Sequence, residues 1–375
     1  MRYILLIGLA GLLVACSDGS DDPAPRPVPD YDFSSVDLRL QQFIDDSERY
    51  DGVSITVVDR SQGQVHKQSL GDHDTDIVFL LASVSKVPTA SLMMALHEDP
   101  ELGFDISAPV RNYLPWEGIF GNRSVEQMLS NTSGIPGLSS IGQYGPHLCQ
   151  FSPLGTLEDC ARTLYSTPLV GTVPPGTVWD YGGSQWQLAG AVAEQVTNSS
   201  WRQAFDRYIA GPCQLDVMDY GNNISAPGSW NGSPDSLVGL DNPLVEGGAI
   251  SDLDDYAAFL LMHLRDGYCG ETQVLSEEGL AFMQQDRGEE LGQPYGLGWW
   301  ILAGNDGESP TVFWDPGAFG SVAWIDTERE IGGFFAIDDY TSYTPIEPVA
   351  FVLAYLIPLV AQAVDEARIA VESDD

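Results

Sequence analysis

Residues 80–96 read LLASVSKVPTASLMMAL and place Ser83 three residues before Lys86. Positions i and i+3 of a helix share one face, so the amine can reach the hydroxyl. The residues that follow, 87–96, are nearly all apolar, which predicts a helix buried on most sides. Burial favours the neutral form of a lysine, and a neutral amine can take the proton of a nucleophilic serine. The stretch therefore predicts a buried helix that carries a nucleophile and its base.

A single Ser-x-x-Lys is weak evidence, because a solvated lysine on an ordinary helix gives the same pattern. Lysine is scarce in this chain, however. Of the 16 residues that are Lys or Arg, only Lys67 and Lys86 are Lys. This scarcity favours the interpretation that Lys86 has a chemical role.

The overall composition limits the partners of the protein. The 375 residues include 54 Asp and Glu against 16 Lys and Arg, a formal net charge of −38. We expect no nucleic acid or anionic membrane surface as a partner, because long-range repulsion opposes the encounter. With 43% hydrophobic and 19% charged residues, the composition is globular and not disordered. The length fits two or three domains, or one large two-lobed enzyme.

The N-terminus has the pattern of an export signal. Residues 1–15 combine a basic start with an apolar stretch too short to span a bilayer. The stretch ends in Leu13-Val14-Ala15-Cys16, which resembles the lipobox of bacterial lipoproteins and implies a lipid anchor on Cys16. An ordinary secretory signal with an incidental Cys is the alternative. Residues 16–36 are expected to form an extended, solvated tether. Ser17 favours the outer membrane, at its periplasmic face or at the cell surface.

Four further cysteines, Cys149, Cys160, Cys213 and Cys269, would be oxidised in an exported chain. Three pairings are possible. We favour Cys149 with Cys160, which closes a short loop and leaves Cys213 with Cys269. No Cys stands beside a His at ligand spacing, so we expect no metal site.

Strand patterns occur at both ends of the chain and helix patterns between them. Residues 52–70 alternate as a β-hairpin around the break at 60–63. Helix signals fill residues 84–285, with capping patterns at 124–127 and 251–254. Strand patterns then return at residues 295–302, 311–314, 320–326 and 331–337. We therefore predict an α+β fold, in which the N- and C-terminal segments form one antiparallel sheet flanked by helices, with an inserted, mainly helical lobe.

Residues 349–364 are almost wholly apolar and resemble a membrane span. The segment holds Pro358, is interrupted by Gln362, and is shorter than the roughly 20 residues that a spanning helix needs. We therefore predict a helix packed on the sheet.

Several other segments stand in the order typical of one family. They are residues 125–136 (VEQMLSNTSGIP), 175–183 (PGTVWDYGG), the helix 184–196, residues 247–251 (GGAIS) and 295–299 (YGLGW). Together with Ser83-Val84-Ser85-Lys86, they make residues 37–345 resemble the penicillin-binding and serine β-lactamase superfamily, especially its class C β-lactamase and family VIII esterase branch. The resemblance implies a β-lactamase/transpeptidase-like fold and one catalytic domain over residues 37–375, with a helical lobe at about 84–285.

The resemblance also implies catalytic roles. Ser83 would be the acyl-accepting nucleophile, Lys86 its activator and Tyr181 the phenol that passes the proton on. The backbone amides of Ser83 and Ala318 would form the oxyanion hole. The histidines show no Ser-His-Asp spacing, and Gly-x-Ser-x-Gly, P-loop and dinucleotide patterns are absent, so we expect no cofactor.

The chain departs from the family pattern at three positions. Asn131 replaces a His, Gly183 replaces the Asn of Tyr-x-Asn, and Asp315 replaces the Lys or His of the third motif, Trp314-Asp315-Pro316-Gly317. We expect Asp315, Gly317, Gly183 and Trp314 to contact substrate. Asp315 would then repel a substrate carboxylate, which disfavours penicillins, cephalosporins and peptides ending in a D-residue. The alternative is that Asp315 caps or pairs within the strand turn.

Five tryptophans stand near the site motifs and are either core residues or a platform for substrate. They are Trp179, Trp186, Trp299, Trp300 and Trp314.

The sequence thus predicts an exported serine hydrolase that cleaves a small acyl ester, or an amide bearing an amine, through an acyl-enzyme. The alternative, motivated by Gly183 and Asp315, is a catalytically weak penicillin-binding-like protein that binds a cell-wall or peptide ligand.

Overall fold

The computed structural model describes residues 28–302, 309–341 and 346–374. The expected signal peptide, the lipidated Cys16 and most of the tether therefore lie outside the described residues. The first helix, α1, begins at Ser34, within the segment expected to be tether, and its Val36 is fully buried.

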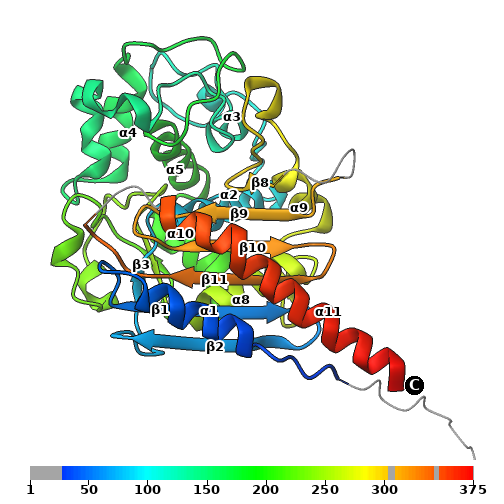
Figure 1. Cartoon of the computed structure of the whole chain (residues 1–375). Helices are drawn as coiled ribbons and strands as arrows, with labels where there is room; N and C mark the ends of the chain where they lie inside the picture. Colours follow the sequence, from blue (N-terminus) through cyan, green and yellow to red (C-terminus); the bar gives the residue numbers. More distant parts are fainter. Residues whose placement is uncertain (1–27, 303–308, 342–345, 375) are drawn as a thin grey trace, which may run out of the picture.

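One antiparallel sheet of six strands joins the two ends of the chain (Figure 1). Its strand order is β2-β1-β11-β10-β9-β8, so the N-terminal hairpin pairs with a C-terminal strand through β1 and β11. This arrangement confirms the predicted α+β fold. The strands are β1 (Gly52–Asp59), β2 (Gly63–Gly71), β8 (Trp300–Ile301), β9 (Val312–Pro316), β10 (Val322–Asp326) and β11 (Ile331–Ala336).

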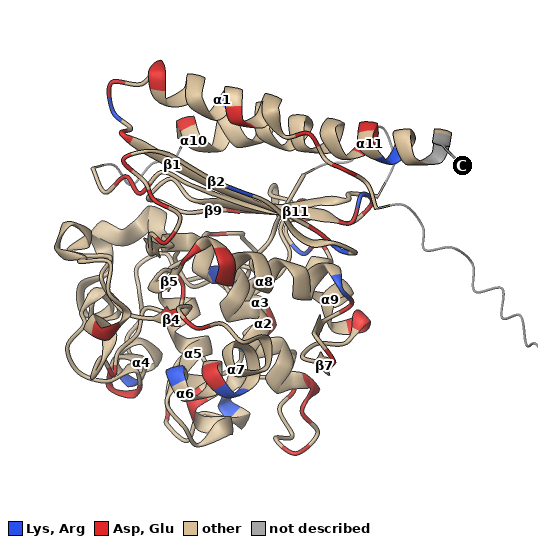
Figure 2. Ribbon diagram, turned by 90° about the horizontal axis from the view of Figure 1, so that it is seen from below, with Lys and Arg blue, Asp and Glu red and all other residues tan. Residues whose placement is uncertain are grey.

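Helices cover both faces of this sheet, and α8 and α2 lie opposite α1 and α11 (Figure 2). Because β1 lies within the sheet, all eight of its residues are buried. Val53, Ile55 and Val57 pack under α1 and α11, whereas Val58 belongs to the larger core on the helical-lobe side. The polar Ser54 is buried within the sheet and hydrogen-bonds Ser69 at 2.8 Å.

Helices fill the middle of the chain, as predicted. The 124–127 pattern is a capping box, in which the Ser124 hydroxyl accepts from the backbone of Gln127. The second cap is Asp252 and not Ser251, because Ser251 ends a strand. The helices are α1 (Ser34–Asp45), α2 (Lys86–Glu98), α3 (Val125–Leu129), α4 (Leu157–Ser166), α5 (Ser184–Thr197), α6 (Trp201–Phe205), α7 (Gly211–Cys213), α8 (Leu253–Leu264), α9 (Glu277–Gln284), α10 (Ile346–Phe351) and α11 (Ile357–Asp374).

The strand expected over residues 295–302 is mostly a turn, and only Trp300–Ile301 pairs in the large sheet. The N–H of Gly296 donates to the carbonyl of Trp299, at 2.8 Å. Gly298 has φ +81, and a Cβ there would lie 2.9 Å from the carbonyl oxygen of Lys86. A glycine is needed for this close approach to the start of α2.

The apolar C-terminal segment forms a helix on the sheet. Residues 346–371 are long and apolar enough to cross a membrane. In the structure, however, Val352, Leu356, Val360 and Val364 pack against the outer face of the sheet. This packing agrees with the predicted core helix.

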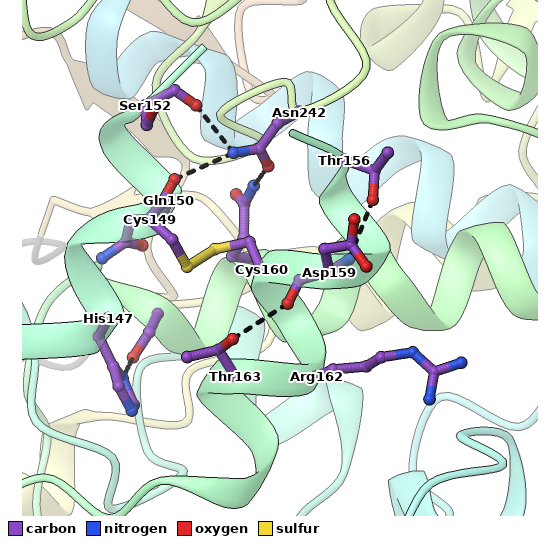
Figure 3. The surroundings of a disulfide bond; sticks show 12 residues. His147, Cys149, Gln150, Ser152, Thr156, Asp159, Cys160, Arg162, Thr163 and Asn242 are labelled. Atoms are coloured by element: carbon purple, nitrogen blue, oxygen red, sulfur yellow. Dashed lines mark hydrogen bonds between the residues drawn. A yellow bond between two sulfur atoms is a disulfide. The ribbon is translucent and has the colours of Figure 1, made fainter. Parts of the chain in front are cut away.

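Two disulfides join Cys149 to Cys160 and Cys213 to Cys269, which are the favoured pairs. The first fastens a loop to α4, as Figure 3 shows. The side-chain amide of Asn242 donates to the carbonyls of Cys149 and Ser152, at 3.0 and 2.8 Å. The loop over residues 138–151 is therefore held from two sides.

Candidate active site

A small sheet fixes the start of α2. It has the order β3-β5-β4 and consists of β3 (Phe79–Leu80), β5 (Ala249–Ser251) and β4 (Asp219–Tyr220). The chain then enters a 3₁₀ turn, η1 (Ala82–Ser85), with Ala82 at φ 47. The hydroxyl of Ser85 donates to the carbonyl of Ala82, at 2.6 Å, and accepts from the N–H of Ala249, at 3.0 Å. These bonds hold the uncommon left-handed backbone immediately before Ser83.

Ser83 and Lys86 meet at the join of η1 and α2. Side chains three residues apart eclipse each other in a 3₁₀ turn, which brings the two groups together. The Nζ of Lys86 donates to the Oγ of Ser83 at 3.2 Å, and Lys86 is fully buried. The structure thus brings together the predicted nucleophile and its predicted base.

Tyr181 lies against the same lysine. The Nζ of Lys86 is 4.5 Å from the centre of the Tyr181 ring. Burial raises the pKa of Tyr181, whereas the charge of Lys86 lowers it, and the net shift is upward. The Tyr181 hydroxyl makes no hydrogen bond of good geometry within the described residues, but the nearby Ser83 hydroxyl also lowers its pKa. Tyr181 is therefore a protonated phenol at rest, suited to passing a proton on.

Asn131, which replaces a family His, supports the loop that carries Tyr181. Its Oδ1 accepts hydrogen bonds from the backbone of Gly182, at 2.9 Å, and from the indole of Trp186, at 2.8 Å. Its carbonyl accepts from the N–H of Asp180, at 2.9 Å. Asn131 therefore fixes the backbone on both sides of Tyr181.

Glu246 is the site residue that the sequence analysis missed. Its carboxylate Oε2 lies 3.3 Å from the Nζ of Lys86, and its backbone carbonyl accepts from the same amine at 3.1 Å. Oε2 also accepts from the backbone N–H of Gly183, at 2.7 Å. One sequence signal was present: Glu246 immediately precedes the 247–251 motif and follows the apolar residues Leu244 and Val245.

The charge of Lys86 differs from the expectation. Burial lowers the pKa of Lys86, but the acidic groups of Tyr181, Glu246 and Asp315 raise it, and the net shift is upward. A buried lysine becomes neutral only where no anion compensates the burial. The prediction that burial alone would neutralise Lys86 was therefore wrong, because the carboxylate of Glu246 lies 3.3 Å from the amine.

Asp315, which was predicted to contact substrate, is not among the described residues that line the pocket at Ser83. It is fully buried on β9, on the face toward α2. Burial raises the pKa of Asp315 well above its ordinary range, although the charge of Lys86 and the backbone N–H of Val87 oppose the shift. Neither carboxyl oxygen makes a hydrogen bond of good geometry with a described residue. Burial therefore favours the protonated, neutral form of Asp315, which would not repel a substrate carboxylate.

Replacing Asp315 by Asn tests this correction. The amide is neutral and has the same shape as the protonated acid, so we expect kcat/KM to stay within about threefold of wild type. The ratio of rates on a neutral ester and on its carboxylated analogue should also be unchanged. A tenfold gain in rate on the carboxylated ester alone would instead place a charged Asp315 at the substrate, as the sequence predicted.

The other expected substrate contacts are also displaced. Trp314 points to the opposite face of β9 and packs against the outer core. Gly183 uses its N–H to bind Glu246. Gly317 is buried behind Ser83, where a Cβ would overlap the carbonyl of Leu81. These two glycines shape the backbone around the site instead of lining it.

A pocket of about 570 Å³ opens at Ser83. Ala318, whose N–H was predicted to complete the oxyanion hole, lies on its wall together with Ser83. Glu246 is the only ionisable side chain among the described residues that line it. Five large apolar side chains also line it. Leu138, Ile141 and Phe151 come from the loop held by Cys149–Cys160, and the other two are Ile224 and Leu244.

The tryptophans divide into two groups. Trp186 and Trp299 are fully buried core residues. Trp179 and Trp300 are half-buried and pack against Tyr181 with their ring planes tilted, with ring centres 5.9 and 5.4 Å from the Tyr181 ring. Trp300 also contacts Trp314, at 5.6 Å. The half-buried rings therefore shield Tyr181 from one side.

The sheet, the helical lobe and the group formed by Ser83, buried Lys86 and Tyr181 together define a class of protein. A family model described as Beta-lactamase matches residues 39–348. The chain therefore belongs to the beta-lactamase family, as the resemblance implied.

Individual relatives are distant. Penicillin-binding protein 4 of Amycolatopsis lactamdurans is 27% identical over 267 residues, which span 64% of this chain and 66% of that protein. A putative beta-lactamase from Bacteroides dorei has a similar structure, with a TM-score of 0.68, 25% identity, and coverage of 89% of this chain and 99% of that one. A family VIII carboxylesterase shares the fold, with a TM-score of 0.65, 17% identity, and coverage of 88% and 97%.

Proposed function

We propose that this protein is a serine hydrolase that cleaves an ester through an acyl-enzyme on Ser83. The observation that carries the proposal is the buried amine of Lys86, 3.2 Å from the Oγ of Ser83. Ser83 also lines a pocket, so a substrate can reach its hydroxyl. Membership of the beta-lactamase family supports the same chemistry.

We propose the following reaction. Lys86 must first lose its proton, because the net pKa shift of this amine is upward. The neutral amine then takes the proton of Ser83, whose oxygen attacks the acyl carbon to give a tetrahedral intermediate. The backbone amides of Ser83 and Ala318 bind the oxyanion. Tyr181 gives its proton to the departing alcohol oxygen and regains one from Lys86, which leaves Ser83 acylated. Water then attacks the acyl carbon, and the same groups return the proton to Ser83.

The pocket favours a neutral acyl group. Burying the hydrocarbon of a substrate against apolar side chains stabilises the complex by about 25 cal/mol per Å² of apolar surface removed from water. No Lys or Arg lies among the described lining residues, and Glu246 is the one ionisable group there. A substrate carboxylate would find no cation to bind and one acid nearby. The sequence predicted the same preference for a substrate without a carboxylate, but on the basis of Asp315. In the structure, the support comes from Glu246 and the apolar walls. This chain shares its fold with a family VIII carboxylesterase, which is consistent with an esterase activity.

A comparison of two chromogenic substrates tests this function. We expect p-nitrophenyl butyrate to be hydrolysed with a kcat/KM at least about 100-fold above that for a chromogenic cephalosporin. The methylene groups of the butyrate gain from burial against the apolar walls. The ester also lacks the carboxylate of the cephalosporin, for which the pocket has no cation. Equal or faster cleavage of the cephalosporin would overturn the ester preference. Binding of peptides without turnover of either substrate would favour the penicillin-binding-like alternative, which Gly183 no longer motivates because Glu246 contacts Lys86 in this chain.

We further propose that the protein is an exported bacterial lipoprotein, anchored through Cys16 in the outer membrane. The lipobox-like sequence and the two disulfides support this location.

A further inference from the structure

We propose that Glu246 is the positioning residue of this site, which holds the amine of Lys86 against Ser83 and sets the charge that Lys86 carries. The inference rests on the proposed acyl-enzyme function and adds a residue to it. Three observations carry it: the contacts of Lys86, the space around Gly182 and Gly183, and the charges that face the amine.

Glu246 provides two of the three polar contacts of Lys86. The amine binds the backbone carbonyl of Glu246 at 3.1 Å, its carboxylate at 3.3 Å and the hydroxyl of Ser83 at 3.2 Å. An ammonium group has three hydrogens, so these contacts account for all of them. With two hydrogens directed to Glu246, the third is directed to Ser83. A flexible lysine side chain is thereby fixed in the geometry that the reaction needs.

The backbone is shaped to admit this carboxylate. Gly182 has φ +72, and a Cβ there would lie 2.6 Å from the Oε2 of Glu246. Gly183 has φ +86, and a Cβ there would overlap the hydroxyl of Tyr144. The N–H of Gly183 donates to Oε2 at 2.7 Å, which holds the carboxylate in place. Gly182 therefore leaves room for the carboxylate of Glu246, and Gly183 supplies one of its hydrogen bonds.

The charged and titratable groups that face Lys86 are Tyr181, Glu246 and Asp315, and those beside Glu246 are Lys86 and Tyr144. Burial raises the pKa of Tyr181, Asp315 and Tyr144, which favours their neutral forms. Burial also raises the pKa of Glu246, but the charge of Lys86 and the N–H of Gly183 oppose that shift. Glu246 is the group in direct contact with the amine, so its negative charge controls the proton on Lys86. Removing that charge should lower the pKa of Lys86.

The experiment compares wild type, Glu246→Gln and Glu246→Asp by measuring kcat and KM on p-nitrophenyl butyrate from about pH 6 to about pH 11. The range extends to alkaline pH because the pKa of Lys86 is shifted upward from an ordinary lysine value of about 10.4, which puts the acid limb of the wild type at the alkaline end. In Glu246→Gln the acid limb of kcat/KM should move to lower pH by about one to three units, because an adjacent opposite charge shifts a pKa by that much. The plateau kcat should fall about 10- to 100-fold through lost orientation, with KM nearly unchanged. Glu246→Asp keeps the charge, so its acid limb should stay within about half a unit of wild type.

Glu98→Gln is the matched control. Glu98 lies at the other end of the same helix, α2, and accepts hydrogen bonds from the backbone and side chain of Ser276. This variant should lose stability in thermal unfolding without a change in the acid limb. An acid limb in Glu246→Gln that stays in place, or that moves to higher pH, overturns the role of Glu246 and leaves the serine hydrolase intact. A wild type that neither hydrolyses esters nor reacts with a fluorophosphonate overturns the proposed function itself.

Discussion

Replacing Ser83 by Ala should reduce ester hydrolysis at least about 1,000-fold, because the variant has no oxygen to form the acyl-enzyme. Substrate should still bind, since the apolar pocket walls are unchanged. The measurement is kcat on p-nitrophenyl butyrate, with binding of an unreactive analogue followed by calorimetry.

Ser236→Ala is the control for this prediction. Ser236 is an exposed loop serine whose hydroxyl bonds only the backbone carbonyl of Ser233 among the described residues, so its loss should leave the rate unchanged. A Ser83→Ala variant that keeps more than about a tenth of the wild-type rate would exclude Ser83 as the nucleophile.

Replacing Lys86 by Met should lower kcat about 100- to 10,000-fold, the usual range for loss of a general base. Methionine is unbranched and fills the buried space of the lysine stem. Glu246, however, loses its cation in a site where burial already raises its pKa. Breaking one side of a buried ion pair costs about 3 to 5 kcal/mol. The variant should therefore be both inactive and less stable in urea unfolding at neutral pH.

The double variant Lys86→Met with Glu246→Gln separates these two effects. The amide removes the unpaired buried charge, so most of the lost stability should return while the activity stays low. Recovery of activity together with stability would show that Lys86 is a structural residue and not the base.

Much of the fold could be predicted because its signals are local. The alternation in residues 52–70 and the capping box at Ser124 each depend on a few neighbouring residues, and the structure contains both elements. The failure at residues 295–302 has a non-local cause. Gly298 turns the chain so that it can approach the backbone of Lys86, which is distant in the sequence. Alternating hydrophobicity carries no information about such an approach.

The candidate site was predictable to the extent that it follows the family motifs. Ser83 and Lys86 are three residues apart, and Tyr181 stands in a recognisable segment, so the sequence identified all three. Glu246 and the inward direction of Asp315 were missed, because both depend on where distant backbones meet. A carboxylate can be assigned to substrate or to a buried lysine only when its burial and its contacts are known.

The two lysines of this chain lie in very different surroundings. One of the two lysines, Lys67, pairs with Asp254 at the partly exposed edge of the sheet, at 2.9 Å. The other, Lys86, is buried between Glu246 and Ser83. Only the second is placed for chemistry, which supports the interpretation drawn from composition.

Covalent labelling directly tests whether Ser83 is the nucleophile. The protein is treated with a fluorophosphonate probe, its intact mass is measured, and the modified residue is located by peptide mapping. We expect a single adduct on Ser83, formed by the wild type and absent from Ser83→Ala. An adduct on another residue, or equal labelling of Ser83→Ala, would contradict the assignment of Ser83 as the nucleophile.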